Sequence, residues 1–382
     1  MADKSAIEWT DATWNPIRAR NGATGRVGWH CEHASEGCRN CYAERLNRGR
    51  FGNGLAYKPG LAKMGAAELY LDEAALVKPL RWRKGRRVFV CSMTDLFADF
   101  VPDAWIDRVF AVMALCPQHQ FQVLTKRSAR MRAYLNEQNR LGHVYSAAQP
   151  LPRPSAAFAS RDQWPYKRED WRWPLPNIWL GVSVEDQKAA DARVPDLLAT
   201  PAAMRFLSCE PLLGAVDLRN LPHRLPEIAS TLMVDALEGR AAVHSDHDIE
   251  PSPMVPLGAK IDWVIAGGES GKEARRMHPD WARSLRDQCA AASVPFFFKQ
   301  WGEWGPDTGP DADFDKQGVQ RDRVMEGAGP CAVRVGTEWQ RFADGYAVPI
   351  ELCTDHGEFV YRLGKKRNGR LLDGVEHSAM PA

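Results

Sequence analysis

Three of the nine cysteines lie close together, at a spacing that suits a metal ion or an iron–sulfur cluster. Cys31, Cys38 and Cys41 follow the pattern C-x6-C-x2-C. Two thiolates two residues apart can bind one centre, and a six-residue loop can bring the third thiolate back to it. Cysteine-ligated clusters normally use four thiolates, so three would leave one iron of a [4Fe–4S] cluster open to a substrate or cofactor.

Zinc is the alternative reading of the same residues. His30 and His33 are close enough in sequence to complete a Cys3His site, which would only hold the loop together. Spacing alone leaves the two metals equally favoured. The position of the cysteines, after a predicted first strand, favours a reactive centre, because that end of a β/α barrel carries the active site.

The composition is that of a globular protein. The chain has 382 residues, 45% of them hydrophobic and 26% charged, with a formal net charge of +2. An odd number of cysteines argues against a secreted disulfide framework. No apolar run is long enough to span a membrane, and the first residues contain no apolar leader. We therefore expect a cytoplasmic protein with no membrane partner.

Six short apolar runs, each followed by polar residues, predict strands that are buried on both faces. They are Arg87–Val90, Phe121–Leu124, Ile178–Val182, Met204–Leu207, Ile261–Ala266 and Pro295–Phe298. Ile7–Trp14 is a candidate first strand. Helical periodicity between the runs is clearest at Trp105–Met113, Ser128–Leu135, Ala189–Leu198 and Trp281–Cys289.

Alternating strands and helices predict an α/β fold with a parallel sheet. We expect a full or partial (β/α) barrel of the TIM type with six to seven parallel strands. A doubly wound open sheet is the alternative, although a dinucleotide-binding Rossmann domain is disfavoured because no G-x-G-x-x-G follows an early strand. The predicted barrel domain covers residues 1–304, with the cysteine loop at 29–42 and insertions near 142–176 and 219–260. Residues 305–382 are predicted to be a C-terminal extension packed on the barrel.

Polar residues at the predicted strand ends are candidates for cofactor binding. Glycines let a ligand approach the backbone, and carboxylates can hold amino or ribose hydroxyl groups. The competing interpretation is a set of tight turns and helix caps. The candidates are Gly267, Gly268, Glu269, Ser270, Ser183, Glu185 and Glu210, with Asp95 and Lys299 as further strand-end positions and Asp11 and Asn15 as supports for the first loop. Cys91 and Cys209 also follow or end predicted strands and could face the site, but we expect them to be buried as small apolar residues.

The near-neutral net charge conceals basic regions. Ile17–Arg50 contains seven arginines and three glutamates, and Lys126–Arg132 adds cations after a predicted strand. Arg161–Trp173 alternates aromatic and basic residues, a combination that suits single-stranded nucleic acid. The alternative is a solvated loop with its aromatic residues packed on the barrel. These regions predict an anionic substrate such as nucleic acid or a nucleotide.

The sequence resembles the three-cysteine-motif proteins of phages and prophages, a family of unknown function. The resemblance begins with Ile7–Pro16 and continues from the cysteine motif into Tyr42-Ala43-Glu44. It covers most of the chain outside the two insertions. The further matching segments are Ser92–Phe97, Leu124–Arg127, Trp179–Glu185, Glu210–Gly214, Ala266–Ser270, Phe298–Gly302 and Gly369–Gly374.

That family is in turn similar to radical S-adenosylmethionine enzymes, which usually carry C-x3-C-x2-C. This chain departs from their pattern by having six residues in the first gap. The resemblance implies a [4Fe–4S] cluster on Cys31, Cys38 and Cys41, with S-adenosylmethionine on the open iron. One-electron cleavage of the sulfonium bond would give a 5′-deoxyadenosyl radical that abstracts a substrate hydrogen atom.

Three hypotheses follow for the function. The first is a radical S-adenosylmethionine-like enzyme of a phage or prophage, acting on nucleic acid or a nucleotide in the bacterial host cytoplasm. It would need an electron donor, and the sequence leaves open whether it also needs a partner protein. The second is a zinc-stabilised, non-enzymatic nucleic-acid-binding phage protein. The third is a barrel hydrolase that uses strand-end carboxylates.

Overall fold

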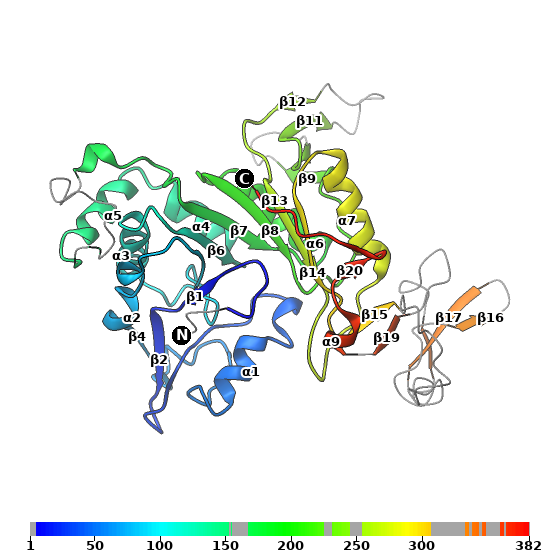
Figure 1. Cartoon of the computed structure of the whole chain (residues 1–382), viewed down its shortest axis with the longest axis horizontal. Helices are drawn as coiled ribbons and strands as arrows, with labels where there is room; N and C mark the ends of the chain where they lie inside the picture. The colour runs from blue at the N-terminus through cyan, green and yellow to red at the C-terminus, as the bar shows by residue number, and fades with distance from the viewer. Residues whose placement is uncertain are drawn as a thin grey trace. The chain divides into compact units, whose positions relative to one another are not determined.

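A seven-stranded parallel sheet is the framework of the fold (Figure 1). The computed structural model describes residues 5–152, 154, 167–224, 231–244, 254–306, 333–335, 338–343, 346–348, 360–362 and 364–381. In order across the sheet, the strands are β1 (Ala12–Trp14), β5 (Arg87–Val90), β6 (Gln120–Thr125), β7 (Ile178–Ser183), β8 (Met204–Cys209), β13 (Trp263–Gly267) and β14 (Phe296–Gln300). The predicted α/β class and partial β/α barrel are confirmed.

Helices lie between most of these strands in the sequence. None of the described helices is long and apolar enough to cross a membrane. Helices α3 and α5 pack against each other. The α-helices are α1 (Tyr42–Arg48), α2 (Glu73–Leu76), α3 (Asp103–Ala114), α4 (Ser128–Leu135), α5 (Arg140–Ala148), α6 (Gln187–Leu198), α7 (Pro279–Ala291) and α9 (Lys365–Asn368), and the short 3-10 helices are Glu36–Cys38, Pro79–Arg81 and Arg168–Asp170.

The described residues also form smaller antiparallel sheets in addition to the parallel one. One pairs β3 (Val27–Gly28), β2 (Ile17–Asn21) and β4 (Ala67–Leu71), and another pairs β12 (Val255–Pro256), β11 (Arg240–His244), β10 (Thr231–Asp235) and β9 (Leu221–Arg224). The remaining pairings join β15 (Trp304–Pro306) with β19 (Val360–Arg362), β16 (Val333–Val335) with β17 (Glu338–Ala343) and β18 (Tyr346–Val348), and β20 (Leu371–Leu372) with β21 (Val375–Glu376).

Burial explains why the strand and helix predictions succeed. Every residue of β7 is buried, as expected of a parallel strand covered on both faces. Helix α7 buries Ala282, Leu285 and Cys289 on one stripe. Its first turn begins after His278, whose ring nitrogen accepts the Asp280 N–H at 3.2 Å.

The structure falls into two compact units. Unit 1 comprises 1–183 and 192–206, and unit 2 comprises 184–191 and 207–382. Unit 1 contains β1, β5, β6 and β7, and unit 2 contains β13 and β14. The predicted boundary at residue 304 stays a prediction, since most of 307–359 lies outside the described residues.

Three local predictions differ from the structure. The first strand begins at Ala12, not Ile7, because residues 7–10 form a turn that is closed by the Thr10 N–H and the Ile7 carbonyl, 3.2 Å apart. The insertion near 142–176 is partly helical, since α5 runs to Ala148. The insertion near 219–260 forms the antiparallel sheet of β9 to β12 in its described part.

The last residues of unit 2 return to strand β14. The His377 carbonyl accepts the Phe298 N–H at 2.9 Å, and the Ala379 carbonyl accepts the indole N–H of Trp263 at 2.9 Å. The Leu371 carbonyl accepts the indole N–H of Trp301 at 2.8 Å. The C-terminal tail is therefore an integral part of unit 2.

His119, one of the buried histidines of unit 1, predicts a loss of stability in acid. Burial lowers the pKa of His119 to about 4 from its ordinary 6.5. Between pH 6.5 and pH 4, this histidine is protonated in the unfolded chain but stays neutral in the folded chain. The free energy of unfolding therefore falls as the pH drops from 6.5 towards 4. We expect His119→Gln to lose less stability than the parent over this range in urea titrations.

The matched control is His143→Gln, whose parent side chain is 51% exposed. It should leave the pH dependence of the parent unchanged. If the free energy of unfolding fell equally steeply with decreasing pH in the parent and in His119→Gln, the assignment to His119 would be wrong.

Candidate functional site

The cysteine loop lies between β3 and α1 in unit 1. The sequence placed it directly after the first strand, but the antiparallel pair β2–β3 intervenes. Cys38 ends a 3-10 turn in which its N–H donates to the Ser35 carbonyl at 2.9 Å. Cys41 is the residue before helix α1, and its N–H donates to the Cys38 carbonyl at 3.2 Å.

Two buried asparagines hold the start of this loop. The Asn47 side chain accepts the Trp29 N–H at 2.9 Å and donates to Asn53 Oδ1 at 2.8 Å. Asn53 in turn donates to the Trp29 carbonyl at 3.0 Å. A side chain at Gly28 would collide with both, since its Cβ would lie 2.4 Å from Asn47 Oδ1. Glycine is therefore required next to the residues that lead into the motif.

The three cysteine thiols are free, half-buried and electrostatically coupled to one another. Burial raises the pKa of the Cys31 thiol, and the neighbouring Asp95, Cys41 and Cys38 raise it further against the effect of Arg127. Burial also raises the pKa of the Cys41 thiol. Cys31 and Cys41 pack, with Trp29, against a small core of Ala43, Tyr57 and Met93. Thiols of raised pKa are protonated at neutral pH, so metal binding here would release protons.

An ion pair between Asp95 and Arg127 lies beside the thiols. The Arg127 guanidinium donates to Asp95 Oδ2 at 3.1 Å and to the Glu32 carbonyl at 2.8 Å. Both side chains are largely buried, at 17% and 8% exposed. Burial alone lowers the pKa of Arg127, but Asp95 and the Cys31 thiol more than offset this, so that the pKa is raised. The sequence proposed Asp95 as a strand-end residue but missed its partner.

The ends of β1 and β5 support the loop. Asn15 accepts the Met93 N–H at 2.9 Å, and its amide donates to Ser92 Oγ at 3.1 Å. Thr94 donates its hydroxyl to the His30 carbonyl. These bonds tie Asn15 to the residues that follow β5, and a supporting role of Asn15 for the cysteine loop itself stays a prediction. Asp11 does not join this region, because Asp11 precedes β1 and pairs with Arg87 at 2.9 Å.

The two histidines considered for zinc have different surroundings. His33 pairs with Glu44, with 2.6 Å between Nε2 and Oε2. His30 is 1% exposed, and neither of its ring nitrogens has a hydrogen-bond partner among the described residues. Its Nε2 lies 3.7 Å from Glu32 Oε1. The rings of Phe100 and Tyr57 pack on it at 4.9 and 6.3 Å.

Donor chemistry decides what this site can hold. Within the described residues, no three His, Cys, Asp or Glu side chains are gathered closely enough to hold a single metal ion as they stand. Three free thiols on one loop are donors that suit a thiolate-bound centre, either an iron–sulfur cluster or zinc. Cys31, Cys38 and Cys41 would be its ligands.

A fourth thiol, that of Cys91, lies near the motif, one of the two placements that the sequence left open for it. Cys91 directly follows β5, is buried, and has a backbone φ of 56°, which is uncommon outside glycine. Burial, Asp95 and the nearby Cys31 raise the pKa of its thiol. The predicted burial of Cys91 and Cys209 is confirmed. The positive φ and the proximity to Cys31 mark Cys91 as a residue of the cysteine site.

In unit 2, the carboxylate of Glu210 pairs with Lys299. The Lys299 Nζ lies 3.0 Å from Glu210 Oε1, and the side chains are 17% and 13% exposed. A Cβ on Gly267 would lie 2.8 Å from the same carboxylate oxygen, and one on Gly268 would lie 1.9 Å from the Trp301 carbonyl. The space beside both glycines is therefore filled by the protein itself.

Glu269 and Ser270 have partners that the sequence did not predict. Glu269 accepts the Arg275 N–H and guanidinium at 2.7 to 3.0 Å. Ser270 Oγ accepts the amide of Gln300 at 2.9 Å. The Gln300 amide oxygen is buried and has no hydrogen-bond partner among the described residues. It is a free acceptor beside the Gly-Gly-Glu-Ser segment.

Ser183 and Glu185 belong to different units. Ser183 ends β7 in unit 1, where its carbonyl accepts the Arg193 guanidinium at 2.7 Å. Glu185 is 1% exposed in unit 2, and its carbonyl accepts the Leu213 N–H at 2.7 Å. Glu185 and Glu210 both raise the pKa of the buried Cys209.

The predicted basic face after β6 is largely neutralised. Arg127, Arg130 and Arg132 pair with Asp95, Asp103 and Asp196 at 3.1, 3.0 and 3.1 Å. Sequence reasoning missed these pairs because the acidic partners come from distant segments. The 161–166 part of the aromatic and basic stretch lies outside the described residues. Trp171 and Trp173 pack on Tyr145 and Phe110, at 5.5 and 6.3 Å between ring centres.

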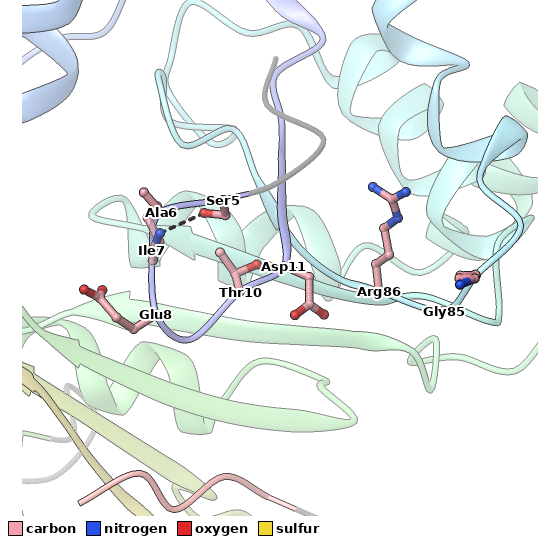
Figure 2. A pocket seen from close by; sticks show the side chains of 9 residues that line it. Ser5, Ala6, Ile7, Glu8, Thr10, Asp11, Gly85 and Arg86 are labelled. Carbon is pink, nitrogen blue, oxygen red and sulfur yellow. Dashed lines mark hydrogen bonds between the residues drawn. The ribbon is translucent and has the colours of Figure 1, made fainter. Parts of the chain in front are cut away.

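A pocket of about 550 Å³ opens at the amino ends of β1 and β5. Figure 2 shows Asp11 and Arg86 on its wall. Its lining residues are Ser5, Ala6, Ile7, Glu8, Thr10, Asp11, Lys84, Gly85 and Arg86. The side-chain hydrogen bond from Arg87 lowers the pKa of Asp11. The pocket lies at the strand ends opposite to Asn15 and Cys91, the face that in barrels serves stability rather than catalysis.

Comparison with known proteins places almost the whole chain in one group. Residues 4–381 match the model of a family described as a protein of unknown function (DUF5131). No curated protein and no solved structure matches the chain. The match specifies no reaction, cofactor or partner.

Proposed function

The chain belongs to the DUF5131 family, and we propose that it is an iron–sulfur enzyme of the radical S-adenosylmethionine type. The single observation that carries the proposal is the set of three free, half-buried thiols on one loop, with mutual electrostatic coupling. The proposed ligands are Cys31, Cys38 and Cys41.

The loop and its neighbours have defined tasks in this proposal. The three thiols lose their protons when they become ligands. The Arg127 guanidinium offsets the negative charge that the thiolates acquire, and its hydrogen bond to the Glu32 carbonyl fixes the loop. Asp95 holds Arg127 in place. When bound and reduced, the cluster and S-adenosylmethionine would supply a 5′-deoxyadenosyl radical.

Binding of S-adenosylmethionine by unit 2 is a separate part of the proposal. The buried Gln300 amide oxygen, which lacks a partner, can accept a hydrogen bond from the ammonium group of the cofactor. Ser270 positions that amide, and Glu185 adds a buried carboxylate in the same unit, whereas Glu210 and Glu269 are already paired with Lys299 and Arg275. Gly267 and Gly268 have a packing role, because protein atoms already fill the space beside them. Ser183, in unit 1, stays a predicted contact.

Other parts of the sequence-based hypothesis stay predictions. They are the phage or prophage origin, the place in the host cytoplasm, the electron donor, the need for a partner protein, and the action on nucleic acid or a nucleotide. The family match bears on none of them.

Metal and sulfide content after anaerobic purification tests the proposed function. We expect about four iron and four sulfide per chain, broad visible absorption that bleaches with dithionite, and cleavage of S-adenosylmethionine to 5′-deoxyadenosine. One zinc per chain without sulfide would overturn the proposal in favour of a structural Cys3His site. Iron and sulfide without cleavage would reject the radical chemistry but keep the cluster.

A further inference from the structure

Helix α1 and the turn after it expose arginines and large apolar side chains together. Tyr42, Leu46 and Phe51 are 44%, 49% and 78% exposed. The arginines between and beside them are also exposed. We call the set the α1 surface, and it consists of Arg39, Tyr42, Arg45, Leu46, Arg48, Arg50 and Phe51.

The arginines of the α1 surface differ from most others in unit 1. The guanidinium groups of Arg39, Arg45, Arg48 and Arg50 make no ion pair or hydrogen bond with any described residue, although the backbone of this segment is hydrogen-bonded. By contrast, ion pairs join Arg87 to Asp11, Arg127 to Asp95, Arg130 to Asp103, Arg132 to Asp196 and Arg140 to Asp107. Four exposed, uncompensated guanidinium groups on one short segment are available to an anionic partner.

Little acidic charge lies nearby in the chain. Residues 36–66 contain six cations and two glutamates, a balance of +4. One of these glutamates, Glu44, already pairs with His33, with 2.6 Å between Glu44 Oε2 and His33 Nε2. Lys58 and Lys63 are exposed and extend the positive charge beyond the helix.

We propose that the α1 surface binds single-stranded nucleic acid. Guanidinium groups bind backbone phosphates, and exposed aromatic rings stack on unpaired bases. Phe51 lies beside Arg50, with the guanidinium carbon 6.0 Å from the ring centre, so one nucleotide can meet both. A duplex offers phosphates but hides its base faces, so it would use the arginines without the rings. An anionic lipid surface likewise offers no bases to stack on.

This inference deepens the proposed function by naming its macromolecular partner, and it rests on that function only for the chemistry that follows binding. The same segment contains the cysteines, since Cys41 immediately precedes α1. Bound nucleic acid would therefore lie next to the cysteine loop within unit 1.

Fluorescence anisotropy tests the proposal with a dye-labelled oligodeoxythymidine of about 15 nucleotides. The full chain is titrated with its cluster and without it. We expect Arg45→Ala/Arg48→Ala to weaken binding about tenfold and to reduce the salt slope by about 1.4, the effect of losing two phosphate contacts. We expect Phe51→Ala to weaken binding about tenfold or more through lost stacking.

The matched control is Arg81→Ala/Arg83→Ala, which removes two exposed cations from another part of unit 1. It should bind as the parent does. A dye-labelled RNA of the same length, titrated in parallel, shows whether ribose or deoxyribose is preferred. Tight binding of either single strand supports the proposal. A duplex or phosphatidylserine vesicles bound as tightly, with no effect of Phe51→Ala, would overturn it.

The outcomes separate this inference from the proposed function. Cleavage of S-adenosylmethionine by a chain that binds no oligonucleotide would reject the α1 surface and keep the enzyme. Binding by a chain that forms no cluster would keep the α1 surface and reject the enzyme.

Discussion

Replacing Cys38 with alanine should remove the iron–sulfur cluster and, with it, S-adenosylmethionine cleavage. Cys38 is half-buried and has no disulfide partner, and it is coupled electrostatically to Cys31 and Cys41. Loss of an outer partner of a metal site already costs roughly 10–100-fold in affinity, so loss of a direct ligand should cost at least as much. Iron and sulfide per chain, after anaerobic reconstitution, give the readout.

The matched control is Cys116→Ala. Cys116 is fully buried, outside the cysteine loop, and has a pKa raised by burial alone. It should retain iron and sulfide at parent levels. If Cys38→Ala keeps its cluster, the ligand assignment is wrong.

Cys91 distinguishes an open cluster from a closed one. Because its thiol lies near Cys31, a fourth thiolate from Cys91 would block the iron that S-adenosylmethionine requires. In the open arrangement, Cys91→Ala retains the cluster and the cleavage activity. Loss of iron from Cys91→Ala would indicate a four-thiolate cluster and contradict the proposed enzyme.

Replacing Asp95 with alanine should be among the most destabilising single changes in unit 1. Asp95 accepts hydrogen bonds from Thr125 Oγ1 at 2.7 Å, from the Phe97 and Lys126 N–H groups at 3.0 Å each, and from Arg127 at 3.1 Å. Removing it leaves a largely buried guanidinium without its counterion, which typically costs about 3–5 kcal/mol. Urea unfolding followed by circular dichroism measures the loss.

Asp103→Ala is the matched control. Asp103 pairs with Arg130 at 3.0 Å, but its side chain is 54% exposed. Exposed pairs contribute about 0–1 kcal/mol, so this variant should unfold close to the parent midpoint. Equal losses for the two variants would show that the Asp95–Arg127 pair does not anchor the cysteine loop.

Strand positions could be predicted because apolar runs flanked by polar residues are a local property of the chain. The run Arg87–Val90 was predicted to the residue, and Phe121–Leu124 is shorter than β6 by one residue at each end. The first strand was overextended, since the Ile7–Thr10 turn carries the same apolar and aromatic residues as a strand. Residue propensities do not distinguish a turn from a strand in this segment, whereas the hydrogen bonds of the folded chain do.

The candidate cofactor residues show where local reasoning ends. Gly267 and Gly268 were predicted to make room for a ligand, and glycine is indeed required there. The atoms that require it belong to Glu210 and Trp301, which approach from distant strands. The glycines in the sequence indicated that no side chain fits at these two positions, but not which atoms occupy the space beside them.

The sequence by itself determined the donor chemistry and the order of β/α elements, because thiol spacing and burial periodicity are set within a few residues. Only the tertiary structure decided which charges are neutralised. Asp95 and Arg127 are 32 residues apart, and Glu210 and Lys299 are 89 apart. Such pairs form where parallel strands bring their ends together, and no local pattern encodes that pairing. For the same reason, the structure alone separates the paired arginines after β6 from the exposed arginines of the α1 surface.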